Sequence, residues 1–226
     1  MAERVDPYEL PDVSDLTVSV LGGTGDQGRG LACRWAAAGL SVVIGSRDAA
    51  RALDAAQGIG PGVRGAVNQE AAALGDVVVV AVPWEAHAPT LRPLADTLAG
   101  RIVVDCVNPL GFDKQGAFAL DVPEGSAAQQ AAALLPGARV VAAFHHVSAV
   151  VLQDLSVTSV DSDVMVLGDD RAATDVVQAL AELVPGMRGR YAGRLRNARQ
   201  VEALTANLIS VNRRYRAHAG LRLTDV

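Results

Sequence analysis

The chain has 226 residues, half of them hydrophobic, and a formal net charge of −5. This size allows one large domain, or one domain with a smaller appendage. The longest apolar run, residues 77–82, is too short to span a membrane, and the charged, proline-bearing opening is unlike a signal peptide, so we expect a cytoplasmic protein.

In the first two thirds of the chain, apolar β-branched runs alternate with alanine-rich segments of helical length. The runs cover residues 17–21, 41–44, 77–82, 102–106 and 139–144. They are uniformly apolar, as strands covered on both faces must be, and the alternation predicts βαβ units. Because such crossovers are right-handed, we expect an α/β fold with a Rossmann-type doubly wound parallel sheet.

After residue 145 the pattern changes. A short run at 164–167, a helix over 171–184, an extended piece near 188–191 and a long helix over 197–217 are expected. We therefore predict an N-terminal extension (1–15), a Rossmann-type domain (16–147) and a small C-terminal α+β domain (148–226). Residues 108–118 are expected to form a loop.

Three glycines follow the first predicted strand directly. Gly23, Gly25 and Gly28 form GxGxxG at the start of a predicted helix. The first glycine permits a tight turn, the second lets the backbone approach a pyrophosphate, and the third allows close packing of helix on strand. Thr24, Asp26 and Gln27 would then line the phosphates, with the Asp26 carboxylate turned away from them.

The end of the second strand indicates which dinucleotide binds. An NAD site places Asp or Glu there for the ribose hydroxyls, whereas this chain has Ser46 and Arg47, with Arg51 one helical turn later. A hydroxyl and two guanidiniums would bind a 2′-phosphate through charge-assisted hydrogen bonds, so NADP is the prediction.

Later strands should complete the pocket, because ligands of open α/β sheets bind at the carboxyl ends of the strands. Trp84 could wall the cleft, and Asn108 could orient the nicotinamide or its ribose; turn chemistry explains either residue equally well. His145 and His146 are adjacent and point to opposite faces of a strand, and no other ligand cluster exists, so no metal is expected. Cys33 and Cys106 lack zinc or disulfide spacing and are expected to be reduced packing residues.

The chain has a single lysine, Lys114, which limits the dehydrogenase mechanisms that are possible. Tyr191 is followed four residues later by Leu195, so the Tyr-x-x-x-Lys pair of short-chain dehydrogenases is absent. A carbonyl reduction needs a proton donor, which only His145 or His146 could supply. A redox partner that is itself a conjugated coenzyme needs fewer catalytic groups, because the positioning of two rings is then the main catalytic device.

Several stretches together resemble one family. They are LGGTGDQGRGLA, VVIGSRD with Arg51, VAVPWEAH, VVAAFHHVSA, RNARQVEALTANLISVNRRY and the final HAGLRL. From about Thr17 to the C-terminus the chain resembles the NADPH-dependent reductases of the deazaflavin coenzyme F-420 (F420), also called coenzyme F-420:NADP oxidoreductases. The resemblance implies that the domain over 16–147 binds NADP and that the domain over 148–226 covers the deazaflavin as a second cofactor. It also implies direct hydride transfer between NADP(H) and the deazaflavin.

The resemblance also implies roles for individual residues. It places Thr24 to Gln27 on the pyrophosphate, and Ser46, Arg47 and Arg51 on the 2′-phosphate. Trp84, Asn108 and Ala149 would lie along the nicotinamide end, and the deazaflavin side would be lined by His145, Val147, Arg199 and Thr205. His145 is the catalytic candidate, acting mainly by positioning. Ser148 and Ala203 depart from the proline and serine that family members often carry there.

Charge is unevenly distributed along the chain. Residues 188–226 carry nine arginines against two acids, a net charge of +7, so residues 1–187 carry −12. The basic segment is either a solvated face or a rim that attracts the phosphate and glutamate tail of the deazaflavin coenzyme. Nucleic acid is not expected as a partner, because few aromatics interleave with the arginines.

Other functions and the assembly stay open at this point. Another NADP-dependent reductase acting on an imine or carbonyl, or a non-catalytic NADP-binding module, are the alternatives. The alanine-rich helices and the apolar stripe of the last helix favour a homodimer.

Overall fold

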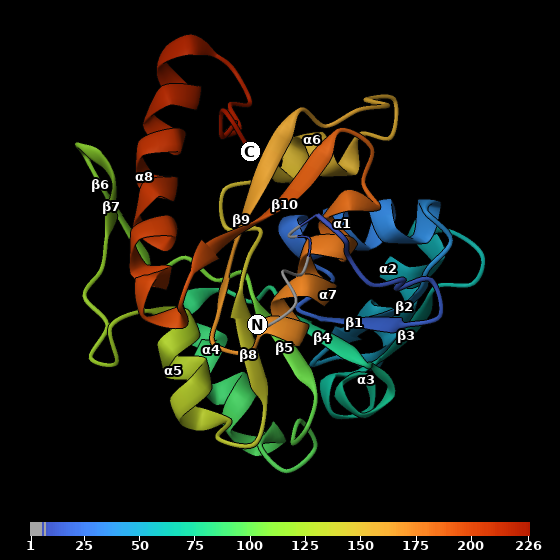
Figure 1. The fold of residues 1–226 in the computed structure, drawn as a ribbon. Helices are drawn as coiled ribbons and strands as arrows, with labels where there is room; N and C mark the ends of the chain where they lie inside the picture. The colour runs from blue at the N-terminus through green and yellow to red at the C-terminus, as the bar shows by residue number, and fades with distance from the viewer. Residues whose placement is uncertain (1–5, 7) are drawn as a thin grey trace.

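The computed structural model describes residue 6 and residues 8–226, so part of the predicted N-terminal extension (1–15) lies outside the described residues. In the described part, eight strands form one sheet in the spatial order β10-β9-β8-β5-β4-β1-β2-β3 (Figure 1). The strands are β1 (Thr17–Leu21), β2 (Ser41–Ser46), β3 (Arg64–Val67), β4 (Val77–Val80), β5 (Ile102–Asp105), β8 (Arg139–Ala142), β9 (Ser162–Gly168) and β10 (Met187–Gly193).

The expected doubly wound fold is confirmed. Neighbouring strands from β3 to β8 are parallel, and the order reverses at β1, which lies between β2 and β4. In such sheets ligands bind beside this reversal, outside the carboxyl ends of the strands. Strand β9 pairs antiparallel with β8, and β10 is parallel to β9, so the sheet continues beyond residue 147.

Helices cover both faces of the sheet, which explains the uniformly apolar strands. In β4, Val77 and Val79 belong to one buried cluster, whereas Val78 and Val80 belong to the other. The helices are α1 (Asp26–Ala37), α2 (Ala49–Ile59), α3 (Asn68–Leu74), α4 (Trp84–Leu91), α5 (Ala127–Leu134), α6 (Ala149–Gln153), α7 (Arg171–Glu182) and α8 (Ala198–Tyr215), with short 3-10 helices at Arg92–Leu94 and Leu195–Asn197. None of them is long and apolar enough to cross a membrane.

Glycine and serine residues mark several of the observed ends. Gly39 and Gly100 have positive φ, which suits glycine after a helix or turn, and Ser126 caps α5 by accepting a hydrogen bond from the Gln129 amide. The segment expected to be a loop is different. It contains the antiparallel hairpin β6 (Leu110–Asp113) and β7 (Gly116–Ala119), which stands beside α8, away from the main sheet (Figure 1).

Candidate functional site

The turn after β1 is fixed by backbone contacts. The amides of Gly22 and Gly23 both donate to the carbonyl of Gly45, at 3.1 and 3.2 Å, so the ends of β1 and β2 are tied together. Gly22 has a φ of +77°, and a Cβ there would lie 2.6 Å from the Ala81 carbonyl oxygen. Only glycine therefore fits the turn at this position.

The two later glycines differ in surroundings. A Cβ at Gly28 would lie 3.0 Å from Gly23 Cα, which is the close packing of helix on strand predicted for this position. Gly25 is open, with no heavy atom within 3.4 Å of such a Cβ, and it caps α1 without a side-chain hydrogen bond. The first amides of α1 are thus available to an anion, and the helix dipole favours one there.

The side chains of the first turn of α1 point to other partners. The Gln153 amide reaches both the carbonyl and the carboxylate of Asp26, and the Gln27 side chain donates to the Phe144 carbonyl at 3.0 Å. The Asp26 carboxylate is directed toward α6, which removes the conflict with a bound phosphate. Neither residue lines the cavity described next, so their backbone amides are what they offer to a ligand.

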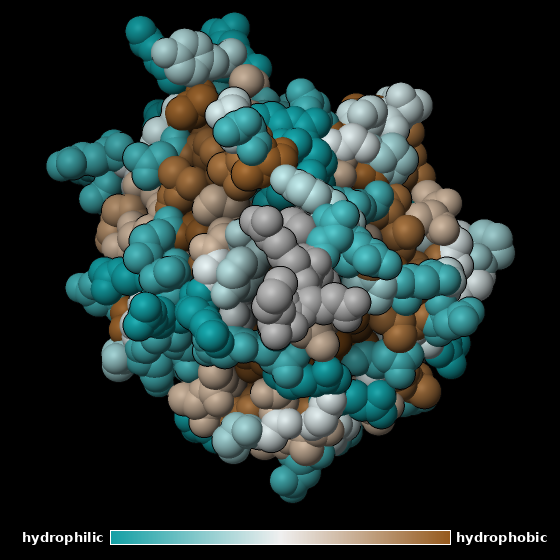
Figure 2. Space-filling view, in the orientation of Figure 1, coloured by the Kyte–Doolittle hydropathy of each residue, from teal (hydrophilic) through white to brown (hydrophobic). Residues whose placement is uncertain are grey.

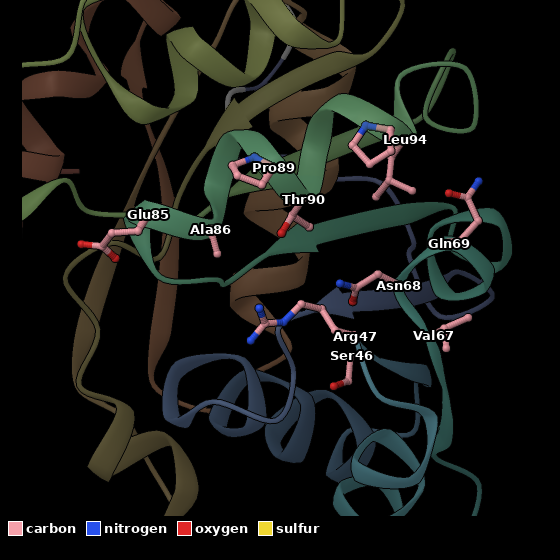
Figure 3. Close-up of a pocket in the computed structure, with 11 residues that line it drawn as sticks. Ser46, Arg47, Val67, Asn68, Gln69, Glu85, Ala86, Pro89, Thr90 and Leu94 are labelled. Atoms are coloured by element: carbon pink, nitrogen blue, oxygen red, sulfur yellow. The ribbon is translucent and has the colours of Figure 1, made fainter.

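Two adjoining cavities of about 470 and 590 Å³ open at the carboxyl ends of β1, β2 and β4. The first is lined by Gly22, Thr24, Gly25 and Arg51 among others, and both are lined by Ser46, Arg47, Asn68, Ala86 and Thr90. Figure 3 shows Arg47 and Asn68 reaching into the space below α4. Thr24 and Gly25 from the predicted pyrophosphate segment therefore meet the predicted 2′-phosphate residues in one groove, whereas Asp26 and Gln27 do not line it.

The nearest carboxylate at this end of the groove is already engaged. Asp48 caps α2, and its Oδ1 accepts hydrogen bonds from the amides of Ala50 and Arg51 at 2.8 and 3.2 Å. Ser46 is buried and Arg47 is exposed. Arg47, Arg51 and Ser46 therefore line the groove beside an aspartate whose Oδ1 is engaged by the helix cap, and two guanidiniums and a hydroxyl suit a phosphate better than a free ribose diol.

Asn68 belongs to this groove and was not predicted. It follows β3 directly, and that strand is not evident in the sequence because its four residues include a glycine and an exposed arginine. The Asn68 Oδ1 is buried and has no hydrogen-bond partner. No local sequence signal marks Asn68, because its place in the groove depends on the pairing of β3 with β2.

The ends of β5 and β8 are joined to α8 through one backbone atom. The carbonyl oxygen of His145 accepts hydrogen bonds from Asn108 Nδ2 at 2.8 Å and from Thr205 Oγ1 at 3.1 Å. Asn108 is predicted for the nicotinamide end, and Thr205 for the deazaflavin side. The Asn108 Oδ1 is buried without a partner, so it is free to accept a hydrogen bond from a ligand.

The imidazole of His145 is buried, and neither ring nitrogen has a hydrogen-bond partner. Burial lowers its pKa to about 4, so the ring is neutral at physiological pH. Burial, together with the neighbouring His145, lowers the pKa of His146 to about 4 as well. A neutral, buried ring favours packing and orientation over proton donation.

The other residues predicted for the cofactors lie on several elements, each with its own contacts. Val147 is buried, and Ala149 begins α6. Arg199 forms an exposed ion pair with Asp121 at 2.6 Å. Trp84 begins α4 and stacks on His87, with ring centroids 5.6 Å apart.

A buried histidine–aspartate pair supports the turn that carries Asn108. His87 Nε2 lies 2.6 Å from Asp105 Oδ2, with both side chains fully buried, and Asp105 Oδ1 accepts from the Val107 amide. Burial alone would lower the pKa of His87, but the Asp105 carboxylate outweighs it and raises that pKa. Neither residue was predicted, because the pairing depends on the contact of β5 with α4.

Glu202 is a second buried acid that the sequence did not reveal. Its two carboxylate oxygens accept hydrogen bonds from the amides of Ala127 and Ala128, at the N-terminus of α5. Burial raises the pKa of Glu202 to about 7, although these two amides act in the opposite direction. The contact fixes α8 against α5, between the turns that carry Arg199 and Thr205.

Helix α6 is held by a buried cation from α1. Arg34 donates hydrogen bonds to the carbonyls of Val151, Leu152, Asp154 and Val157, at 2.7 to 2.9 Å. These carbonyls lie at the C-terminal end of α6 and in the loop after it, where a cation complements the helix dipole. Arg34 therefore helps to position the segment that begins at Ala149.

The arginine-rich segment is not a free basic rim along its whole length. Ion pairs with acidic residues engage five of its nine arginines, namely Arg188, Arg190, Arg194, Arg199 and Arg222. Burial alone would raise the pKa of Asp163, but Arg188, Arg222 and the Leu223 amide hold it well below its usual range. Arg188 and Arg222 thus help to attach residues 221–226 to β9 and β10.

Comparisons with known proteins show which family the chain resembles. The family model described as NADP oxidoreductase, coenzyme F420-dependent, matches residues 17–109. The F420-dependent NADP reductase of Methanothermobacter thermautotrophicus is 42% identical, covering 93% of this chain and 96% of that protein, and that of Methanocaldococcus jannaschii is 38% identical, covering 93% and 99%. A solved structure from Arthrobacter sp. FB24, described as a "putative f420 dependent nadp-reductase", has a TM-score of 0.77 at 28% identity and covers 92% and 99% of the two chains.

Proposed function

This chain belongs to the family of coenzyme F420-dependent NADP oxidoreductases, and from that premise we propose how its residues serve the reaction. The protein is an oxidoreductase that transfers a hydride between NADP(H) and the deazaflavin coenzyme F420. The main support for this function is the 42% sequence identity to the Methanothermobacter thermautotrophicus reductase over nearly the full length of both chains. The nicotinamide and the deazaflavin supply the hydride chemistry, and the protein supplies binding, orientation and exclusion of water.

The proposed NADP-binding site is the groove at the end of β2. We propose that the open amides after Gly25 hold the pyrophosphate and that Ser46, Arg47 and Arg51 bind the 2′-phosphate. The support is the charge of the groove, together with the engagement of the Asp48 carboxylate at the cap of α2. A 2′-phosphate gains charge-assisted hydrogen bonds there that a 2′-hydroxyl does not.

The reacting ends of the two coenzymes would meet around the carbonyl of His145. In this proposal Trp84, Asn108 and Ala149 lie along the nicotinamide, and the deazaflavin side is lined by His145, Val147, Arg199 and Thr205. Because one carbonyl accepts from both Asn108 and Thr205, the two sides are held at a fixed separation. Such positioning is the main catalytic device for transfer between two flat rings.

The division at residue 147 also belongs to the proposal. Residues 16–147 would bind NADP, and residues 148–226 would cover the deazaflavin, chiefly through α8. We further propose a cytoplasmic location, consistent with two free cysteines, and a small-molecule coenzyme rather than nucleic acid as the partner.

A homodimer is proposed from the exposed apolar surface beside α8. Phe112 and Phe118 of the hairpin are 69% and 45% exposed, and Val211 and Tyr215 of α8 are exposed as well. Figure 2 shows hydrophobic side chains gathered over the region of α8. Exposed apolar patches of this kind mark interaction sites in soluble proteins, and sedimentation of the purified protein would measure the assembly.

A direct assay tests the activity. The protein is mixed with NADPH and F420, and the absorbance of the oxidised deazaflavin is followed. Bleaching that depends on both NADPH and protein is the expected result. Consumption of a cyclic imine without bleaching would favour the alternative imine reductase, and NADPH binding without any turnover would favour a non-catalytic module.

A further inference from the structure

Asn68 lies where the two cavities of the groove join, and it has no task within the protein. Its side chain lines both cavities beside Ser46 and Arg47. The Oδ1 is buried without a partner, and no hydrogen bond from Nδ2 exists among the described residues. A buried amide oxygen without a hydrogen-bond partner costs free energy, so this side chain is not committed to a partner within the described part of the protein.

The backbone is shaped to admit this side chain. A Cβ at Gly45 would lie 2.9 Å from Asn68 Oδ1, so the amide occupies the space that glycine leaves at the end of β2. Strands β2 and β3 pair Ser46 with Val67, which brings Asn68 to the edge of the sheet beside Ser46 and Arg47. In Figure 3 the Asn68 amide and the Arg47 guanidinium enter the same space, below Ala86 and Thr90.

The missing acid at the end of β2 leaves one hydrogen-bond donor of the coenzyme without an acceptor. An NADP ribose keeps its 3′-hydroxyl, which in NAD enzymes is bound by the carboxylate at that position. A carboxylate would repel the neighbouring 2′-phosphate, whereas a neutral amide does not. Rotation about the soft terminal torsion of asparagine turns Oδ1 into the cavity and exchanges it with Nδ2.

We propose that Asn68 is a specificity-determining residue, whose amide oxygen accepts a hydrogen bond from the 3′-hydroxyl of the adenosine ribose. This inference rests on the proposed NADP site. Arg47 and Arg51 then recognise the phosphate, and Asn68 recognises the sugar in a way that both NADP and NAD share. A substitution of Asn68 and a substitution of Arg47 should consequently have different signatures.

Calorimetric titration of the full chain with three adenosine ligands separates these roles. The ligands are adenosine 2′,5′-bisphosphate, 5′-AMP, and 3′-deoxyadenosine 5′-monophosphate, which lacks the hydroxyl in question. Asn68→Ala should weaken the first two by the same factor, about threefold to tenfold for one neutral hydrogen bond, and leave the third unchanged. Arg47→Ala should weaken the bisphosphate alone. Glu70→Gln, an exposed change on the same helix, is the matched control and should alter none of them.

The isosteric Asn68→Asp variant keeps the shape of the side chain and tests the charge. It should weaken the bisphosphate further than Asn68→Ala does and strengthen 5′-AMP, because a carboxylate repels the phosphate and accepts from the hydroxyls. Equal losses by Asn68→Ala on 5′-AMP and on its 3′-deoxy analogue, or no loss on either, would overturn the role of Asn68. An Arg47→Ala variant with undiminished bisphosphate affinity would instead overturn the phosphate site, while the 5′-AMP pair still decides the role of Asn68.

Discussion

Replacement of Arg34 by leucine tests how α6 is held in place. The guanidinium donates four hydrogen bonds to carbonyls in and after α6, and no carboxylate pairs with it among the described residues. A hydrogen bond from a charged donor contributes about 1.5–3 kcal/mol net, but the four are not additive and the released carbonyls can be partly rehydrated. We expect Arg34→Leu to lower the free energy of unfolding by about 3–5 kcal/mol, which is about 10 °C in melting temperature for a chain of this size.

Thermal unfolding followed by circular dichroism measures this effect. Arg29→Leu, an exposed change on the same helix, is the matched control and should move the midpoint by at most about 2 °C. Arg34→Lys should fall between the two, because an ammonium has three donors and lacks the planar fork. Ala149, at the start of α6, is proposed to lie along the nicotinamide. The leucine variant should therefore also raise the KM for NADPH at temperatures below its melting range. A midpoint for Arg34→Leu equal to that of Arg29→Leu would refute the reasoning.

Three further changes test the site and its titration. Arg47→Asp should raise the Kd for NADPH by about 10- to 100-fold and leave that for NADH nearly unchanged, because one charge-assisted hydrogen bond is lost and a repulsion is added; an unaltered ratio of the two dissociation constants would contradict the phosphate site. Thr205→Val keeps the size of the side chain but removes its hydrogen bond to the His145 carbonyl, so steady-state kinetics should show a higher KM for F420 with the KM for NADPH unchanged; equal rises in both would indicate general loosening. The folded-state pKa of His146 is depressed to about 4, so the stability contributed by the neutral ring is complete above pH 6.5 and declines as the pH falls from 6.5 toward 4. His146→Leu should therefore lose less stability than the natural chain between pH 7 and pH 4.5 in denaturant titrations, and parallel losses would remove His146 as a cause of acid sensitivity.

The sequence revealed the parts of the site that depend on local geometry. The close approach of helix and strand at Gly28 was predictable from the glycine spacing, and the tight turn falls at Gly22, one residue before the predicted Gly23. The residues proposed to bind the 2′-phosphate follow the next strand at once. Strand β4 was equally plain, because four consecutive valines predict a strand buried on both faces.

Elements that depend on contacts with distant parts of the chain could not be predicted from their local sequence. Strand β3 and the hairpin strands have four residues each, and Gly65 and Gly111 weaken their strand pattern. Helix α6 has five residues and depends on Arg34, more than a hundred residues earlier in the chain. Asn68 was missed for the same reason, since its place in the groove follows from the pairing of β3 with β2.

The two tryptophans occupy opposite kinds of environment, with a practical consequence for spectroscopy. Trp35 is fully buried, packs edge-on against Phe144 and donates to the Leu180 carbonyl, whereas the partly exposed Trp84 begins α4 at the proposed nicotinamide end. A Trp84→Phe variant therefore leaves Trp35 as an internal fluorophore that reports loss of the native core. The complementary Trp35→Phe variant leaves an emission that a bound nicotinamide can quench, so unfolding and coenzyme loading become separate optical signals.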